Sequence, residues 1–485
     1  MPAPRSSRTV ADLPASPRRP DETKQQWVYR QLAGAIDTRR LQPGDSVPST
    51  RALAARWGLS RGVVEIAFEQ LGREGYLEAV VGRGTRVSTL PPECFLRARP
   101  EVADATLSTP HTASPATPSA HPVRAGQPFI ARLPDLQTFD LWAWRASIAR
   151  AARALGPDNM GDADPRGLAA LREGVCRHLA LSRGLSCTPD DILIVTGIRH
   201  AIDLCAQAAV PEGAAVALED PGYAGAEAIF RLRGRRTVDI PLDAEGIDVN
   251  ALRQVTVAMA YVTPAHQAPT GVAMSARRRA ALLAWAEASG AWLLEDDYDS
   301  DFSYERAPLP ALKSEDRAGR VLFCGSFNKS LFPGLRIGYI VAPAALMPRL
   351  VALRAATGRA NPVLDQLTLA EFIQSEALLR QLKKARVAYK RRRDLIVHEL
   401  MAADCEAGDF QGLHAGFHFV LRLPPGTDEG LIAARANAQG VVVQGLRAFW
   451  RGHTPAPPPA LVIGYTALSD AQAKWSARQL AALLR

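Results

Sequence analysis

The chain has 485 residues, too many for one ordinary domain and enough for several. Its composition, 47% hydrophobic and 22% charged, is that of a soluble globular protein, and it contains no apolar run long enough for a membrane helix. The formal net charge is +9, and residues 1–97 alone carry 15 Lys and Arg against 10 Asp and Glu. A basic N-terminal module is typical of nucleic-acid binding, although a merely solvated basic surface would have the same charge.

The first residues and the cysteines indicate the compartment. Residues 1–21 lack the apolar core of a secretory signal, and we expect them to form a disordered basic tail. The six cysteines are scattered and form neither a CxxC pair nor a Cys/His cluster. This pattern favours the reducing cytoplasm and predicts no structural zinc or other metal site.

Residues 22–90 are predicted to form a compact domain that starts with an amphipathic helix around Trp27. Residues 48–50 then cap a second helix, Arg51 to Trp57, and Ser60 caps a third, which runs to about Glu74. Two short helices joined by a Gly-containing turn form a helix-turn-helix, whose second helix meets base edges with its N-terminal residues. Residues 80–87 are predicted to be two strands around a Gly-rich turn, which would form a wing.

The stretch LQPGDSVPSTRALAARWGLSRGVVEIAFEQLGREGYLEAVVGRGTRV, residues 41–87, resembles the winged helix-turn-helix of GntR-type bacterial regulators. The alternative is a small helical domain that docks another protein, but the caps, the turn glycines and the wing agree with one another and favour DNA. The resemblance implies contacts with double-stranded operator DNA from five residues: Arg51, Ser60, Arg61, Arg83 and Gly84.

Residues 91–127 are rich in Pro, Ala, Ser and Thr and are predicted to be a linker. From 128 to 485, apolar strands alternate with helical patterns, which predicts an α/β fold with a mostly parallel sheet. In such sheets, ligand-binding groups collect just past the carboxyl ends of the strands. Five places of that kind occur here.

The first two places lie after the strands near residues 192–195 and 215–220. At the first, the free N–H groups of a helix start, Gly197 and Ile198, would attract a phosphate, and Arg199 would add a charge or be an ordinary surface arginine. At the second, Tyr223 would stack on an aromatic cofactor ring, the alternative being an ordinary, partly buried tyrosine.

The third and fourth places carry an amide and a group of acids. The amide of Gln267 is the candidate to stabilise a negatively charged ring oxygen, whereas His266 is more simply a packed or hydrogen-bonded histidine. In Glu295-Asp296-Asp297-Tyr298-Asp299, Asp296 would pair with a protonated ring nitrogen and Tyr298 would donate to the ring oxygen. A solvated loop or a divalent-cation site is the alternative, and the preceding hydrophobic strand disfavours simple solvation.

The fifth place is Lys329, which follows a short apolar strand, with Ser326 and Ser330 beside it and Arg336 seven residues on. A lone lysine is nearly always a solvated surface group, but this context suits an amine that forms a Schiff base with a phosphorylated aldehyde. The serines and the arginine would hold the phosphate, and the lysine would attack the carbonyl.

The motifs TPAHQAPTG, EDDYDSDF and GSFNKSLFPGLRIGY resemble those of fold-type I aminotransferases, and with the winged helix the chain resembles the MocR family of bacterial transcription regulators. The resemblance implies pyridoxal 5'-phosphate (PLP) as cofactor, a smaller C-terminal α+β subdomain, and a head-to-tail homodimer with cofactor sites near the subunit boundary. It also implies individual roles: Lys329 is the Schiff-base lysine, Asp296 the pyridine partner, Tyr298 the ring-oxygen donor, Tyr223 the stacking ring and Arg336 the phosphate anchor.

The chain departs from the family pattern at several positions. Met160 stands where members usually carry a tyrosine, and Gly197-Ile198-Arg199-His200 lacks the usual hydroxyl, for which Arg199 would compensate. Gly225 stands where GABA-responsive members have an arginine, so GABA is disfavoured as effector. The usual arginine for a substrate carboxylate has no secure match, and Arg447 is a positional candidate for an effector carboxylate.

The predicted function is a PLP-dependent DNA-binding transcription regulator in the bacterial cytoplasm. Its operator binding would respond to PLP, or to an amine or amino acid that forms an external aldimine, without net turnover. One alternative is an active aminotransferase that carries a helix-turn-helix domain, and another is a sensor of PLP supply without an amine effector. The basic stretch 383–393 is predicted to be a solvated helix face, with extra DNA-backbone contact as the alternative.

Overall fold

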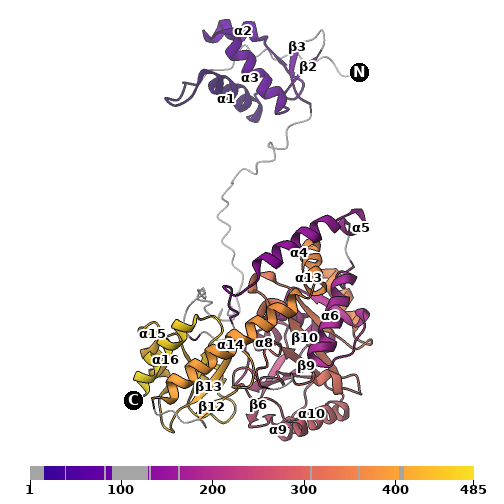
Figure 1. The fold of residues 1–485 in the computed structure, drawn as a ribbon. Coiled ribbons are helices and arrows are strands. Elements are labelled where there is room, and N and C mark those ends of the chain that lie inside the picture. The colour runs from indigo at the N-terminus through magenta and orange to yellow at the C-terminus, as the bar shows by residue number, and fades with distance from the viewer. Residues whose placement is uncertain are drawn as a thin grey trace. The chain divides into compact units, whose positions relative to one another are not determined.

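The computed structural model divides into two compact units, Met1–Thr112 and Ala113–Arg485, and each is described by itself (Figure 1). The described residues are 16–38, 40–80, 84–89, 129, 133–161, 164–305, 308–358, 361–403 and 409–485. The predicted tail therefore lies mostly, and the predicted linker 91–127 entirely, outside the described residues. No helix in the described part of the chain is both long and apolar enough to cross a membrane.

The N-terminal unit is a three-helix domain with a small antiparallel sheet, as Figure 1 shows. Its elements are α1 (Lys24–Asp37), β1 (Ser46–Val47), α2 (Thr50–Trp57), α3 (Arg61–Arg73), β2 (Leu77–Val80) and β3 (Gly84–Val87), with the strands in the order β1-β3-β2. Apolar residues of α1 and α3, among them Val28, Leu32, Val64 and Leu71, are fully buried between the elements. The predicted helix-turn-helix and wing are both present.

The helix starts and the turn follow from local chemistry. Thr23 forms a capping box with Gln26 at the start of α1, and the Ser49 hydroxyl accepts from the Ala52 N–H at 3.3 Å at the start of α2. Gly58, which ends α2, has φ +63°, a conformation that glycine adopts without strain. Ser60 occupies the N-cap position of α3, but its side chain makes no capping hydrogen bond, unlike the prediction.

The C-terminal unit is built on an eight-stranded sheet in the order β4-β11-β10-β9-β8-β5-β6-β7. Its strands are β4 (Ile192–Val195), β5 (Ala215–Asp220), β6 (Arg236–Asp243), β7 (Gly246–Ile247), β8 (Met259–Val262), β9 (Trp292–Asp297), β10 (Val321–Ser326) and β11 (Gly338–Val341). The neighbours from β10 through β6 are parallel, whereas β11 runs antiparallel to both β10 and β4. The mostly parallel sheet is confirmed, and the carboxyl ends of its parallel strands meet at one edge.

Helices pack on both faces of this sheet and bury separate apolar clusters. The helices of this part of the unit are α4 (Leu141–Ala154), α5 (Pro157–Met160), α6 (Ala169–Arg183), α7 (Ile198–Ala209), α8 (Ala224–Leu232), α9 (Val249–Arg253), α10 (Ala276–Ser289), α11 (Phe327–Ser330), α12 (Met347–Thr357) and α13 (Val363–Gln374), of which the short α5 has no buried residue. Short 3₁₀ turns are η3 (Pro189–Asp191), η4 (Leu312–Glu315), η5 (Pro333–Leu335) and η7 (Leu446–Phe449). The fully buried strands explain the continuous apolar runs in the sequence.

The end of the chain forms the α+β subdomain that the family resemblance implied. Its antiparallel sheet has the order β12-β13-β15-β14. The elements are α14 (Ala377–Met401), β12 (Phe410–Gln411), β13 (His418–Arg422), α15 (Glu429–Ala438), β14 (Gln444–Gly445), β15 (Ala460–Gly464) and α16 (Asp470–Leu484). The long helix α14 packs along α16 (Figure 1).

The basic stretch 383–393 lies within α14. Lys383, Lys384, Lys390 and Arg391 are exposed, as predicted for a solvated helix face, but two of its arginines are buried. Arg392 is 6% exposed and pairs with Asp135 at 2.7 Å, and Arg393 is 3% exposed and pairs with Glu305 at 3.0 Å. Cations held in this way support the packing of α14 and are not available to DNA phosphates.

Candidate functional site

The predicted lysine and acid lie at neighbouring strand ends. The strands β9 and β10 are parallel, and Asp296 is the register partner of Cys324, five residues before Lys329. The chain turns after Ser326 into the one-turn helix α11, which carries the half-buried Lys329. An amine and a buried carboxylate therefore stand at the same edge of the sheet.

Asp296 has a buried hydroxyl partner that the sequence reading missed. Asp296 is 6% exposed, and the hydroxyl of Tyr261, which is 2% exposed, donates to its carboxylate. Burial, and then the Asp296 charge, raise the pKa of Tyr261 well above its ordinary value, so the phenol stays a neutral donor. In the parallel pairing, Tyr261 is the partner of Leu294, which shares a strand face with Asp296. Only the strand register brings the two side chains together.

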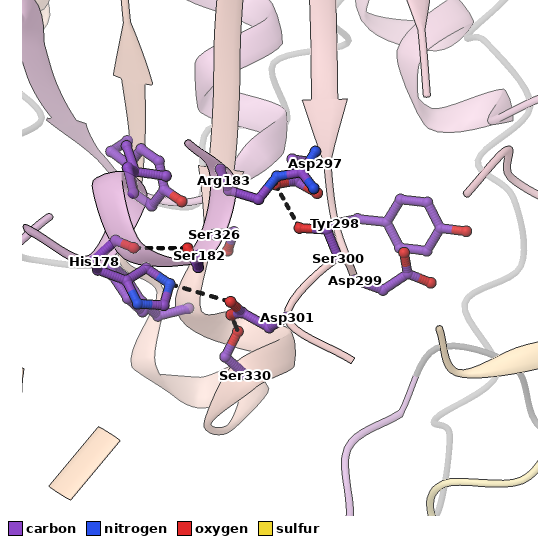
Figure 2. Close-up of a pocket in the computed structure, with 13 residues that line it drawn as sticks. His178, Ser182, Arg183, Asp297, Tyr298, Asp299, Ser300, Asp301, Ser326 and Ser330 are labelled. Atoms are coloured by element: carbon purple, nitrogen blue, oxygen red, sulfur yellow. Dashed lines mark hydrogen bonds and ion pairs between the residues drawn. The ribbon is translucent and has the colours of Figure 1, made fainter. Parts of the chain in front are cut away.

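Two of the neighbouring acids, Glu295 and Asp297, are buried or half-buried and face other partners, so this part of the acidic segment is not a solvated loop. Glu295 accepts from the backbone N–H groups of Leu312 and Lys313 at 2.8 and 2.9 Å. Asp297 forms an ion pair with the buried Arg183 of α6 at 2.9 Å (Figure 2). Burial raises the pKa of both Glu295 and Asp297, and Arg183 acts against that effect.

A second polar group secures the helix that carries the lysine. Ser330 donates to Asp301 at 2.6 Å, and His178 of α6 approaches the same carboxylate at 3.1 Å (Figure 2). Burial would raise the pKa of Asp301, but His178, Ser330 and Arg386 together outweigh it and hold that pKa at about 2. Burial likewise lowers the pKa of His178, but Asp301 and Asp297 together outweigh it, so that pKa lies above its ordinary value. The single hydroxyl hydrogen of Ser330 is thus used by Asp301, contrary to its predicted role as a phosphate donor.

The residues predicted to hold a phosphate surround the start of α7 and the end of η5. The backbone of Gly197 has φ +101°, and a Cβ there would lie 3.0 Å from the amide of Asn328. The Ser326 hydroxyl accepts from the Asn328 N–H at 3.2 Å and so caps α11. Arg336 is exposed, with φ +53°, and has no ion-pair partner among the described residues. Free N–H groups at the start of a long helix and an exposed guanidinium are suitable groups for a dianion.

Tyr223 lies against a glycine and an arginine. Arg199 donates to the Tyr223 hydroxyl at 3.3 Å. A Cβ at Gly225 would come closer than 3.0 Å to three atoms of the Tyr223 ring and hydroxyl. The Tyr223 ring therefore occupies the space that a side chain at position 225 would need.

An arginine of the C-terminal subdomain holds the turn before Tyr223. Arg451 binds Asp239 at 2.5 Å and the Glu219 carbonyl oxygen at 2.5 Å. The sequence analysis did not single out Arg451. The arginine that it named, as a candidate for an effector carboxylate, is Arg447. Arg447 is exposed, and its backbone N–H donates to Glu429 at 2.6 Å.

The amide of Gln267 has other partners than the predicted ring oxygen. Gln267 is 1% exposed, and its amide nitrogen lies 3.1 Å from Glu219 Oε2 and 2.9 Å from the Ala268 carbonyl oxygen. Its amide oxygen accepts from the Thr270 hydroxyl at 2.6 Å. These bonds give Gln267 a structural role in the turn after β8.

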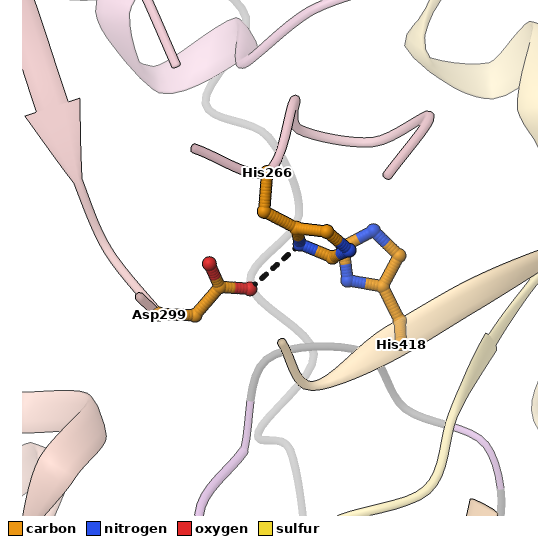
Figure 3. Close-up of side chains that lie close together, drawn as sticks. All are labelled: His266, Asp299 and His418. Atoms are coloured by element: carbon orange, nitrogen blue, oxygen red, sulfur yellow. Dashed lines mark hydrogen bonds and ion pairs between the residues drawn. The ribbon is translucent and has the colours of Figure 1, made fainter. Parts of the chain in front are cut away.

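Beside this turn lies a group of buried side chains, His266, Asp299 and His418 (Figure 3). One ligand atom from each lies within 4.8 Å of the others, although the sequence predicted no metal site. The Nδ1 atom of His266 is 2.9 Å from Asp299 and 3.1 Å from the Tyr298 hydroxyl. The predicted ring-oxygen donor is therefore in contact with a buried histidine.

Most residues predicted to touch DNA are exposed on the N-terminal unit. Arg51, Ser60, Arg61 and Gly84 are all exposed, and Gly84, the first residue of β3, has φ +79° at the turn end of the wing. Arg61 forms an i,i+4 ion pair with Glu65 at 2.6 Å, a surface pair worth at most about 1 kcal/mol. Arg83 lies outside the described residues.

Comparison with known proteins agrees with both units. Residues 24–87 match the family "Bacterial regulatory proteins, gntR family", and residues 134–472 match "Aminotransferase class I and II". Two solved structures share the fold of the C-terminal unit, each with 25% identity over 75% of this chain and 91% of the other. They are the Pyrococcus horikoshii kynurenine aminotransferase, with a TM-score of 0.67, and an archaeal alanine:glyoxylate aminotransferase, with 0.68.

Three curated relatives resemble the chain over nearly its whole length. The probable rhizopine catabolism regulatory protein MocR of Rhizobium meliloti is 31% identical over 91% of this chain and 90% of that protein. The HTH-type transcriptional regulator TauR of Rhodobacter capsulatus is 34% identical over 88% of this chain and 89% of that protein. The pyridoxine biosynthesis transcriptional regulator PdxR of Corynebacterium glutamicum is 31% identical over 96% of this chain and 97% of that protein. The chain therefore belongs to the MocR family of transcription regulators, in which a GntR-type DNA-binding domain is joined to a domain of the class I and II aminotransferase fold.

Proposed function

We propose that this transcription regulator binds PLP at the strand ends of its C-terminal unit, and that its affinity for operator DNA responds to PLP or to an amine or amino acid that reacts with it. The observation that carries the proposal is the pair of Lys329 and buried Asp296 at adjacent parallel strand ends. Two structural relatives support it: the Pyrococcus horikoshii enzyme was solved with PMP, and Thermus thermophilus LysN with a phosphopyridoxyl-leucine.

The donor set fits this cofactor. When bound, PLP supplies an aldehyde for an amine and a ring that acts as an electron sink. Lys329 is the amine that attaches to it, and Asp296, held by Tyr261, faces the ring nitrogen. The N–H groups of Gly197, Ile198 and Arg199 and the guanidinium of Arg336 hold the phosphate, with Ser326 shaping the turn.

The remaining residues of the proposed site contact the cofactor ring or limit which effector can bind. Tyr223 stacks on the ring and is braced by Arg199. Tyr298 donates to the ring oxygen. Gly225 offers no cation, so an effector carboxylate must find one elsewhere, and Arg447 stays a candidate for it. This arrangement favours effectors other than GABA.

The regulator acts on double-stranded DNA as a head-to-tail homodimer in the bacterial cytoplasm, where it associates with the nucleoid. Arg51, Ser60, Arg61, Arg83 and Gly84 make the DNA contacts. Ligand binding changes operator affinity only if the ligand prefers one arrangement of the dimer over another.

The test is a titration of the DNA upstream of the protein's own gene, with and without PLP and a panel of amines. A salt-sensitive affinity that changes with PLP or one amine supports the proposal. The same panel with a keto acid acceptor measures turnover. Rapid turnover combined with a DNA affinity that no ligand changes would favour an aminotransferase with an incidental DNA-binding domain.

A further inference from the structure

The buried pair His266 and Asp299 lies directly behind Tyr298. The His266 side chain is 0% exposed and that of Asp299 is 2% exposed. A single nitrogen, Nδ1 of His266, is 2.9 Å from Asp299 Oδ2 and 3.1 Å from the Tyr298 hydroxyl oxygen. The position of one proton therefore decides whether Tyr298 donates to His266 or accepts from it.

The Asp299 carboxylate determines where this proton lies. Asp299 can only accept, so its contact with His266 places the proton on Nδ1. The Tyr298 oxygen, which contacts the same N–H, then accepts from it. A tyrosine hydroxyl carries one hydrogen, and with His266 as donor this hydrogen is directed away from the histidine.

The other nitrogen of His266 supports the same tautomer. Its Nε2 atom is buried and has no hydrogen-bond partner among the described residues. Cβ atoms on Gly271 and Gly412 would lie 3.1 and 3.3 Å from it, so backbone carbon surrounds this side of the ring. A proton on Nε2 would be a buried donor without an acceptor, which is costly.

The remaining titratable groups that face the ring are His414 and His418, with ring centroids 5.7 and 5.0 Å from that of His266. The Nε2 atom of His418 is 2.9 Å from the Pro269 carbonyl oxygen, which only accepts, so that nitrogen carries the His418 proton. The Nε2 atom of His418 therefore bonds this carbonyl oxygen and not the Nδ1 atom of His266.

One ligand atom from each of His266, Asp299 and His418 lies within 4.8 Å of the others, which is also the spacing condition for a metal site. The direct 2.9 Å contact between His266 Nδ1 and Asp299 Oδ2 is explained by a hydrogen bond. A Cβ at Gly416 would come closer than 3.0 Å to both Asp299 Oδ2 and His266 Nδ1, so the chain covers the pair directly. His266 and Asp299 are hydrogen-bonded to each other, whereas His418 makes its bond elsewhere (Figure 3).

We propose that Asp299 and His266 are positioning residues, which keep Tyr298 a hydrogen-bond donor toward the ring oxygen of bound PLP. The inference rests on the proposed function, because it requires the cofactor at this site. A hydrogen bond to that oxygen stabilises its negative charge, so losing it makes the nearby proton of the bound cofactor harder to remove. This relay of Asp299, His266 and Tyr298 thereby sets the pH at which the visible absorption band of the loaded protein titrates.

The decisive variant is Asp299→Asn, because an amide can accept from Nδ1 or donate to it and so no longer fixes the proton on Nδ1 as a carboxylate does. Where the amide donates, the proton moves to Nε2 despite the cost of a buried unpaired donor there. Tyr298 then turns its hydrogen toward His266. We expect the pH midpoint of the titration of the visible band to rise by about one pH unit, equivalent to about 1.4 kcal/mol. Tyr298→Phe should raise it similarly, and the double variant should add little because both changes remove one interaction. His266→Asn, which keeps an amide N–H near Nδ1, should restore more of the midpoint than His266→Leu.

Asp135→Asn is the matched control, because it removes a buried carboxylate that pairs with Arg392 and contacts neither His266 nor Tyr298. Its midpoint should equal that of the wild type. A midpoint unmoved by Asp299→Asn but raised by Tyr298→Phe would overturn the inference. A wild-type protein that forms no visible band with PLP would instead refute the proposed function.

A second measurement needs neither cofactor nor variant. Nitrogen NMR shifts of His266 in the full-length wild-type protein distinguish the two neutral tautomers. Protonation at Nδ1 supports the relay, and protonation at Nε2 overturns it.

Discussion

Replacing Gly225 by alanine is expected to weaken PLP binding without destabilising the C-terminal unit. The new Cβ would lie closer than 3.0 Å to the Tyr223 ring and hydroxyl, so the ring must leave the position it holds against Arg199. Gly225 lies within α8, where alanine is the better helix former by about 1 kcal/mol. The unfolding free energy of the cofactor-free protein should therefore stay the same or rise.

The expected loss of affinity follows from what an aromatic contact contributes. Stacked aromatic pairs contribute about 0.5–1.5 kcal/mol beyond their buried area. Losing that contribution raises the PLP dissociation constant about 2-fold to about 12-fold. A PLP titration followed by absorbance or by protein fluorescence measures this change directly.

Tyr223 variants separate the possible causes. Tyr223→Phe keeps the ring and removes only the bond from Arg199, so it should bind PLP more tightly than Tyr223→Ala. Adding Gly225→Ala to Tyr223→Ala should have little further effect, because the displaced ring is already absent. Wild-type affinity in Gly225→Ala, together with weak binding in Tyr223→Ala, would show that the observed ring position is not the one that binds the cofactor.

Three further predictions concern other parts of the molecule. Lys329→Ala should abolish the visible band with PLP while the far-UV circular dichroism stays unchanged, and a band of normal intensity would refute the assignment of the lysine. Arg61→Ala should reduce operator affinity by about 1–3 kcal/mol in a gel-shift titration and leave binding to unrelated DNA nearly unchanged, whereas equal losses on both DNAs would make Arg61 a phosphate contact. His178→Asn should destabilise the protein to urea more at pH 6 than at pH 9, because a raised pKa contributes stability that is present below the ordinary value and lost as the pH rises through the folded-state value. An equal loss at both pH values would show that the Asp301 pair contributes through packing alone.

The modular organisation and the location of the site could be predicted from the sequence because their signals are local. Caps such as Ser49, the turn at Gly58 and continuous apolar runs each act within a few residues. Parallel strands bring their carboxyl ends to one edge, so polar residues after each run were predicted to gather there. The positions of Lys329 and Asp296 at neighbouring strand ends follow from that rule.

The partners of individual side chains could not be predicted in this way. The contact between Tyr261 and Asp296 depends on the register of β8 against β9, and the use of Gln267 in its own turn depends on Glu219 at the end of another strand. The charge of α14 looked like a solvated face, but Arg392 meets Asp135 from a segment 257 residues away. Charge and residue type are visible in the sequence, whereas the choice of partner is made between distant segments.

The sequence by itself determined that a winged helix-turn-helix precedes an α/β domain with a mostly parallel sheet, and which strand ends carry reactive groups. The tertiary structure alone decided which acid is paired with which cation, which hydroxyl holds Asp296, and which side chains His266 contacts. The reason is physical. Local conformation depends on short-range sterics and hydrogen bonds, but the protonation and orientation of a buried group depend on the few atoms packed around it, and those atoms come from distant parts of the chain.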